Sequence, residues 1–224
     1  MTFSIIGRDR RTGALGIAVT SSSPCVGARC MHLRSNVGVV ASQNVTDPRL
    51  GDLILDRLEA GEGAQQALDA VLDGYEHASF RQLTVLKADG DSAHFSGSGT
   101  LGTNRVVVVD DAVAAGNLLS TEEVPAQMAE AFAASEGEEL ERRLYAALSR
   151  GEQAGGELGD VRSCGLAVVH DVGWRVTDLR VDDADAPIQD LDRLLDVWMQ
   201  QRDDYVVRGV DPAASPSYGV PGDE

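Results

Sequence analysis

The residue with the clearest chemical potential is the second one. Thr2 follows the initiator Met1 and precedes the apolar run FSIIG. A threonine hydroxyl is a weak nucleophile, but at a chain terminus it lies beside its own α-amine, whose pKa of about 7.7–8.0 leaves a neutral fraction that accepts the hydroxyl proton. Because Thr2 is small, a cytosolic aminopeptidase could remove Met1. Thr2 is therefore a candidate nucleophile, and the ordinary alternative is a threonine that begins a strand.

Three side-chain amides lie at or beyond the ends of apolar strands, in QNV and AGNLL. Acyl transfer needs hydrogen-bond donors aimed at the developing oxyanion, and a buried amide needs a hydrogen-bonding partner. We expect Asn117 to be the oxyanion donor and Gln43 and Asn44 to contact substrate. The alternative for Asn117 is a hydrogen bond to its own turn.

Two further polar groups flank predicted strands. The serines of TSSS end the second strand, so one hydroxyl, assigned to Ser22, could lie beside Thr2, although a serine turn is the simpler interpretation. Arg162 and Ser163 precede another strand and could bind a substrate carboxylate, because a guanidinium matches a carboxylate in a bidentate manner. A surface ion pair is the alternative for Arg162.

Other chemistries lack their sequence patterns. GSGTLG has the glycine spacing of a dinucleotide-binding loop, but a strand-like RVVVV follows it instead of a helix. The four histidines are scattered, and the cysteines form no paired metal-binding spacing. Cys25 as a nucleophile would need a neighbouring histidine. We expect no metal and no cofactor.

The composition indicates where and with what the protein acts. The formal charge of −17 and the absence of a basic cluster argue against nucleic-acid binding. No signal peptide precedes the first strand, and no apolar run approaches the length of a membrane span. Three cysteines without a secretion signal fit reduced thiols. We expect a cytoplasmic protein with a small-molecule substrate and no membrane partner.

The elements that must position these residues follow from the periodicity. Strand-like runs and helical runs occur in groups: β-hairpins, a helix pair, further hairpins, and a second helix pair. Grouped elements and nearly continuous apolar strands predict an α+β fold, a four-layer αββα sandwich of two mainly antiparallel sheets. The strands are predicted within 3–9, 15–23, 37–45, 81–90, 92–99, 105–119, 162–171 and 173–183, and the helices within 47–61, 63–75, 120–134, 137–156 and 185–209.

The C-terminal end differs from the rest of the chain. We predict one domain over residues 1–210 and an extended tail over 211–224, because Pro212, Pro216 and Pro221 oppose a helix. Tyr205, Tyr218 and the tail valines give this end more apolar surface than a solvated tail carries. We therefore expect it to pack on a neighbouring subunit, in a homodimer or larger homo-oligomer. The alternative is a disordered or folded-back tail.

Several ordered motifs resemble one family. TFSIIGRDRRTGALGIAVTSSSPCVGARC, VGVVASQNVTDPRLG, AAGNLLSTEEVPAQMAEAF and DLRVDDADAPIQDLDRLL are similar to the family catalogued as domain of unknown function 1028, over nearly the whole chain. Many members carry Gly-Gly-Asp, a basic residue, Gly and Gln-Ser before the next strand, whereas this chain has GGELGDVRSCG.

The resemblance implies a fold shared with the N-terminal-nucleophile (Ntn) hydrolases, whose mature chains begin with Thr, Ser or Cys. It adds weight to Thr2 as the nucleophile. The expected activity is an amidohydrolase that cleaves a C–N amide bond of a small metabolite after Met1 is removed. The alternative is a catalytically silent member of the fold that serves as a binding or assembly protein.

Overall fold

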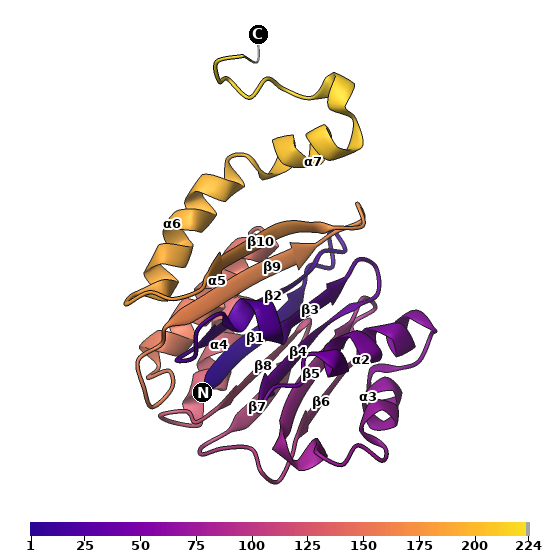
Figure 1. Cartoon of the computed structure of the whole chain (residues 1–224), viewed down its shortest axis with the longest axis vertical. Coiled ribbons are helices and arrows are strands. Elements are labelled where there is room, and N and C mark those ends of the chain that lie inside the picture. The colour runs from indigo at the N-terminus through magenta and orange to yellow at the C-terminus, as the bar shows by residue number, and fades with distance from the viewer. Residues whose placement is uncertain (223–224) are drawn as a thin grey trace.

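Two antiparallel sheets form the centre of the molecule (Figure 1). The computed structural model describes residues 1–222. The larger sheet has six strands in the order β10-β9-β2-β1-β8-β7. They are β1 (Thr2–Arg8), β2 (Leu15–Ser21), β7 (Arg105–Val109), β8 (Ala112–Asn117), β9 (Ser163–Val169) and β10 (Arg175–Val181). The smaller sheet has the order β3-β4-β5-β6. Its strands are β3 (Met31–Arg34), β4 (Gly38–Asn44), β5 (Arg81–Lys87) and β6 (Ser92–Ser96).

Helices cover the outer face of each sheet. The smaller sheet carries α2 (Arg49–Glu59) and α3 (Ala64–Leu72). The larger sheet carries α4 (Glu123–Ala134), α5 (Leu140–Gln153) and α6 (Pro187–Met199). The helices bury an apolar stripe against the strands, as amphipathic surface helices do. The order of layers is therefore helices, sheet, sheet, helices, which confirms the α+β sandwich expected from the sequence.

The alternation of side chains along β1 explains why three apolar layers form. Phe3 and Ile5 point outward into the cluster under α4 and α5, whereas Ile6 points inward between the two sheets. The inner cluster includes Val39 and Leu86 of the smaller sheet. A third cluster lies between that sheet and α2 and α3. Because both faces of each sheet are covered, the strands read as nearly continuous apolar runs.

Glycines allow the outer helices to approach the larger sheet closely. A Cβ atom at Gly7 of β1 would lie 2.7 Å from the Phe132 ring of α4, and one at Gly16 of β2 would lie 2.6 Å from Leu144 of α5. Real Cβ atoms do not approach so closely, so a side chain here would push the helices outward. The position of β1 under the helix pair therefore depends on these two residues.

Three elements differ from the sequence prediction. The short helix α1 (Val26–Cys30) and β3 were not predicted, because five and four residues are too short to show a period. The single helix predicted over 185–209 is wrong: α6 ends at Met199, and α7 (Arg202–Val210) follows in a new direction (Figure 1). At the break, Arg202 turns toward Glu139, which caps α5, and Glu141 in its first turn.

The described part of the C-terminal tail folds back on α7. A 3₁₀ turn over Pro212–Ala214 precedes the extended residues. The Arg208 guanidinium lies 4.0 Å from the Tyr218 ring, and Tyr205 stacks on Trp198 with ring centroids 5.4 Å apart. Residues 223–224 of the predicted tail lie outside the described residues. Tyr218 and Val220 are both 56% exposed, so packing of the tail on a neighbouring subunit stays a prediction.

Candidate active site

A row of polar side chains crosses the inner face of the larger sheet at one end. Thr2 of β1 pairs with Asn117 of β8, and Ser21 of β2 pairs with Ser163 of β9. Ser21 lies beside Thr2, since the preceding pair along β1 and β2 is Phe3 with Thr20. Directly paired residues point to the same face of a sheet. The inner face of the larger sheet is therefore polar at this end, while its outer face, which carries Phe3, is apolar.

The smaller sheet presents a matching row. Gln43 of β4 pairs with Gln82 of β5, and Gln82 pairs with Ser96 of β6. Gln43, Gln82 and Asn117 are fully buried. Buried amides must find hydrogen-bonding partners, and here they find them across the gap between the two sheets.

The amides form a directed network. Gln82 Nε2 donates to the Gly116 carbonyl at 3.1 Å, which leaves Gln82 Oε1 as an acceptor. That oxygen accepts from Gln43 Nε2 at 2.8 Å and from Asn117 Nδ2 at 3.0 Å. Gln43 Oε1 in turn accepts from the Ser4 hydroxyl at 2.7 Å. Because a backbone carbonyl cannot donate, Gly116 sets the direction of the whole chain of bonds.

This direction leaves Asn117 with unused capacity. Its Oδ1 is buried and has no hydrogen-bonding partner among residues 1–222. Its Nδ2 uses one N–H for Gln82, and an amide nitrogen has two. The second N–H remains available to a group placed beside Thr2. This geometry is compatible with the predicted oxyanion role.

The Thr2 hydroxyl is held by the residue that precedes it. Thr2 Oγ1 donates to the Met1 carbonyl at 2.6 Å and lies 3.4 Å from Ser21 Oγ. The Ser21 hydroxyl donates to the same carbonyl. Thr2 is 5% exposed, so its hydroxyl lies in a protected position. Removal of Met1 would release both hydroxyls and place an amine where the peptide nitrogen of Thr2 now lies.

An unexpected acid lies near the chain terminus. Glu157 is 6% exposed, and neither of its carboxylate oxygens has a hydrogen-bonding partner within residues 1–222. Burial raises the pKa of Glu157 to about 7, against the opposing effects of the positive chain terminus and of Ser22. Ser22 therefore lies close to this carboxyl but outside good hydrogen-bonding geometry. Of the serines in TSSS, Ser21 is nearest the Thr2 hydroxyl, and Ser22 belongs to the surroundings of Glu157.

A cavity of about 590 Å³ adjoins the loop that carries Glu157. Its lining includes Glu152, Glu157, Asp160, Arg162 and Asp185. The side chain of Met1 lies against this loop, because a Cβ atom at Gly159 would be 3.2 Å from Met1 Cε. Met1 therefore contacts a loop that also lines the cavity.

Asn44 and Arg162, which were predicted to contact substrate, bind other groups of the protein instead. Asn44 Nδ2 donates to the Phe80 carbonyl at 2.7 Å, and Asn44 Oδ1 accepts from Leu101 N, so this amide fastens a loop. Arg162 donates to Asp183 at 2.9 Å and forms an ion pair with Asp185, which is the alternative expected for it.

Ser163 belongs to the polar row, but its hydroxyl already has partners. Ser163 Oγ donates to the Ser23 carbonyl at 2.6 Å and accepts from Val26 N at 3.1 Å. This hydroxyl therefore holds the turn after β2 and is not directed at a substrate.

Sequence reasoning missed Gln82 and Glu157. Gln82, like Gln43, is a polar residue within an apolar strand. The reasoning applied to Gln43 would therefore have identified Gln82 as well. Glu157 lies in a glycine-rich loop, where an acidic residue is ordinarily solvated. Its burial depends on backbone bonds between this loop and the segment after β8, namely Ser120 N to Gly156 O and Leu158 N to Leu118 O, both 3.0 Å.

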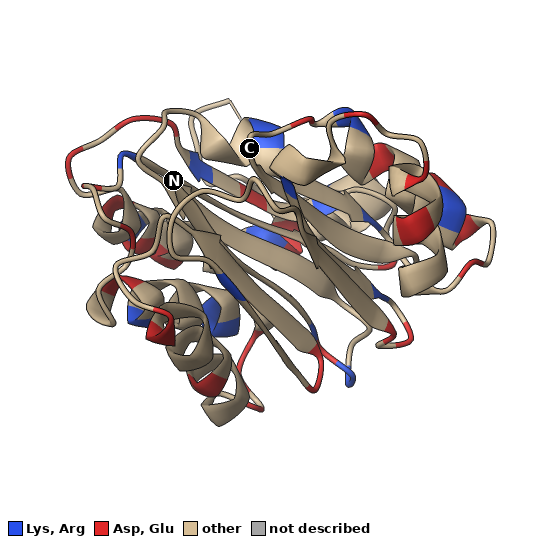
Figure 2. Ribbon diagram, turned by 90° about the horizontal axis from the view of Figure 1, so that it is seen from below, with Lys and Arg blue, Asp and Glu red and all other residues tan. Residues whose placement is uncertain are grey.

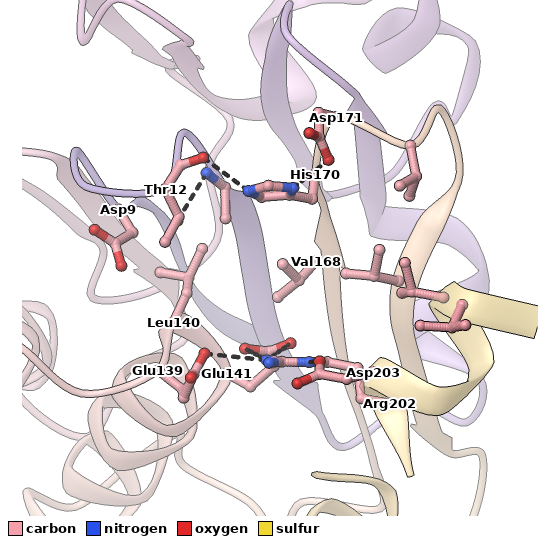
Figure 3. Close-up of a pocket in the computed structure, with 15 residues that line it drawn as sticks. Asp9, Thr12, Glu139, Leu140, Glu141, Val168, His170, Asp171, Arg202 and Asp203 are labelled. Carbon is pink, nitrogen blue, oxygen red and sulfur yellow. Dashed lines mark hydrogen bonds and ion pairs between the residues drawn. The ribbon is translucent and has the colours of Figure 1, made fainter. Parts of the chain in front are cut away.

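A second cavity lies on the other side of the larger sheet, between α5, α7 and the β9–β10 hairpin (Figure 3). It measures about 310 Å³ and is lined by valines together with charged residues. These charged groups are already paired: Arg202 binds Glu141 at 3.1 Å, and Asp9 binds Arg11 at 2.9 Å. The reactive groups described above lie elsewhere, so this cavity is not the candidate active site.

Most charged residues lie on helices and loops, and the strands carry few (Figure 2). Among residues 1–222, no cluster of three or more His, Cys, Asp and Glu side chains is arranged to hold a metal ion. No helix within that range has the length and apolar character needed to cross a membrane.

Comparisons with other proteins identify the family. A model of the family of unknown function DUF1028 matches residues 2–191. The crystal structure of protein SPO2555 from Silicibacter pomeroyi, described with the same family, superposes with a TM-score of 0.81 at 33% sequence identity. That similarity covers 88% of this chain and 88% of the other. A comparison with curated proteins found no match. The chain therefore belongs to the family of unknown function DUF1028.

Proposed function

We propose that this protein is an amidohydrolase of the Ntn type, which cleaves a C–N amide bond of a small metabolite after Met1 is removed. One observation carries the proposal. Thr2 begins a central strand, and its hydroxyl lies in a protected polar row opposite Asn117 and 3.4 Å from Ser21 Oγ. An α-amine created at Thr2 would be part of the same residue as the hydroxyl, so that nucleophile and base need no further positioning.

The reaction follows from these groups. The neutral α-amine accepts the Thr2 hydroxyl proton as Oγ1 attacks the acyl carbon of the substrate. The resulting ammonium then gives this proton to the leaving nitrogen as the C–N bond breaks, which leaves an ester on Thr2. Water hydrolyses the ester and restores the free hydroxyl.

Asn117 supplies the electrostatic part of the proposal. The N–H that Asn117 does not donate to Gln82 would donate to the oxyanion of the tetrahedral intermediate. Because the bond to Gln82 holds the amide at 3.0 Å, the donor is oriented before substrate arrives. Preorganised donors of this kind are the largest contribution in many acyl-transfer enzymes.

A catalytically silent binding or assembly protein is the second candidate. The observation in its favour is that the Met1 carbonyl accepts both the Thr2 and the Ser21 hydroxyl, so both hydroxyls have a partner when Met1 is retained. In that state Thr2 has no free amine, and the hydrolytic mechanism lacks its base.

The test combines intact-mass measurement with a panel of small amides. We expect the purified protein to lack Met1 and to hydrolyse at least one amide class, with an acyl adduct on the N-terminal peptide. Thr2→Ala should abolish hydrolysis and leave the melting temperature nearly unchanged, while Thr103→Ala, at an exposed position, should retain full activity. Hydrolysis by Thr2→Ala, or by a chain that still begins at Met1, would rule the mechanism out.

A further inference from the structure

The Glu157 carboxyl has an environment that an ordinary structural acid does not have. It is more than nine-tenths buried, yet both oxygens lack a hydrogen-bonding partner among the described residues. Burying a carboxylate without a partner costs several kcal/mol or forces the group to take up a proton. The backbone cannot easily release the side chain, because Glu157 forms a bridge with Leu119 and the neighbouring residues bond to the same segment. Apart from the nearby Ser22, the carboxyl oxygens therefore have unused capacity to accept hydrogen bonds from a donor or a cation.

The positive charge that acts on this acid is the chain terminus. The terminal amine acts on the Glu157 carboxyl, and the Met1 side chain contacts the same loop at Gly159. When Met1 leaves, the amine moves by one residue to Thr2. The carbonyl that now accepts the Thr2 and Ser21 hydroxyls leaves with Met1. The new amine then needs an acceptor.

The other charged or titratable groups around this position do not fill that role. The guanidinium of Arg162 is paired with Asp183 and Asp185 and forms no ion pair with Glu157. Asp160 is exposed, and burial raises the pKa of the Cys30 thiol, on which the chain terminus also acts, so this thiol is neutral. Glu152 of α5 lines the cavity beside the loop, and burial raises its pKa as well.

We propose that Glu157 binds the α-ammonium of Thr2 after Met1 is removed and thereby orients this amine beside the Thr2 hydroxyl. The inference deepens the proposed function and rests on the same removal of Met1. Glu157 is a positioning residue, since it acts on the substrate only through the amine. An ammonium donates up to three hydrogen bonds, so it can satisfy the orphaned oxygens of Glu157 and still face Ser21.

The pairing has a defined effect on protonation. A carboxylate near an ammonium favours the charged form of both groups, so it raises the pKa of the amine and lowers that of Glu157. Replacement of Glu157 by an uncharged residue should therefore lower the pKa of the Thr2 amine. For an opposite charge at close range, the expected change is about 1 or more.

The chain offers a direct way to measure this pKa without any substrate. Lys87 is its single lysine, so an acylating reagent meets only two amines, Lys87 Nζ and the α-amine. The full chain beginning at Thr2 is made by cleaving an N-terminal fusion directly before that residue. Trace acetylation with isotopic acetic anhydride from pH 5 to pH 11, followed by mass spectrometry of the two peptides, gives the pKa of each amine.

Glu157→Gln should lower the pKa of the α-amine by about 1 or more relative to the wild type, with Lys87 unchanged as internal reference. Asp160→Asn removes the same charge from an exposed position of the same loop and should leave the amine within about 0.3 of the wild type. Glu157→Asp, which keeps the charge, should restore most of the effect. An α-amine pKa that is equal in the wild type and Glu157→Gln, or lowered as much by Asp160→Asn, would overturn the proposal.

The result does not depend on hydrolysis. If no amide is cleaved but the amine still responds to Glu157, the proposed enzymatic function fails and the ammonium site stands. If an amide is cleaved and the amine does not respond, the function stands and the role of Glu157 is refuted. With an active substrate, Glu157→Gln should also move the acidic limb of the pH profile of kcat/KM to lower pH, which a merely structural defect would not do.

Discussion

The amide network between the two sheets makes a quantitative prediction about Gln82. Its side chain is fully buried and takes part in four hydrogen bonds, to Gln43, Asn117, Ser96 and the Gly116 carbonyl. Gln82→Leu keeps a similar volume but removes every one of these bonds. The perturbation therefore isolates the polar contribution of the network from the cost of a cavity.

The magnitude follows from the groups that lose their partners. Gln43 Nε2 and Asn117 Nδ2 both donate to Gln82 Oε1, so both become unpaired. Leaving a buried polar group without a partner costs about 1–3 kcal/mol, which gives about 2–6 kcal/mol for the pair. This is a large part of the roughly 5–15 kcal/mol by which a domain is stable. Gln43→Leu combined with Gln82→Leu should cost less than the sum of the single changes, because one unpaired group is removed.

Urea unfolding measures this cost. With a slope of about 3 kcal/mol per M, the midpoint of Gln82→Leu should fall by about 0.7–2 M, with the slope itself unchanged. Gln66→Leu, at an exposed position of α3, is the matched control and should stay within about 0.5 kcal/mol of the wild type. A Gln82→Leu midpoint within about 0.2 M of the wild type would refute the reasoning, because it would mean that the two donors find other partners.

Three further predictions concern the site and the tail. If an amide substrate is found, Asn117→Ala should lower kcat by about 10²–10³-fold through loss of the oxyanion donor; a change confined to KM would assign Asn117 to substrate binding. In the chain that retains Met1, the raised pKa of Glu157, about 7 against an ordinary 4.5, means that stability is lost as pH rises between these values. Urea midpoints at pH 5 and pH 8 should therefore differ less in Glu157→Gln than in the wild type, and equal differences would contradict this. Deletion from Asp211 onward should reduce the molar mass measured by light scattering; a monomeric full-length chain, or a truncated chain of unchanged oligomeric mass, would exclude the tail as an assembly element.

Much of the fold could be predicted because its signals are local. Apolar strands bounded by turn residues are visible within ten residues of sequence, as in the hairpin of β5 and β6, where Gly90 takes the positive φ of 98° that the Asp89-Gly90 turn requires. Pro187 begins α6, as its position in the first turn predicted. The break after Met199 was not visible in the sequence, because the helical period continues through it. The break accompanies the bond of Arg202 to Glu141 of α5, a contact between distant segments.

The site was only partly accessible from sequence. Thr2, Gln43 and Asn117 were each singled out as polar residues at strand ends, and the structure places all three at the same end of the inner layer. Asn44 follows Gln43 directly, yet successive residues of a strand point to opposite faces, and its amide fastens a loop instead. Which of two neighbouring residues faces inward depends on how the strands pair. The pairing of Gln43 with Gln82, and that of Asn117 with Thr2, cannot be read from one strand alone.

What the amino-acid sequence by itself determined is most of the elements and the family, because periodicity, turn residues and ordered motifs act over short distances along the chain. Only the tertiary structure decided which polar groups share a site. The pairing of Thr2 with Asn117 joins strands at opposite ends of the first half of the chain, and the burial of Glu157 requires its loop to bond with the segment after β8. Such contacts depend on the packing of distant segments, so the unpaired acid beside the chain terminus appears only when the chain is folded.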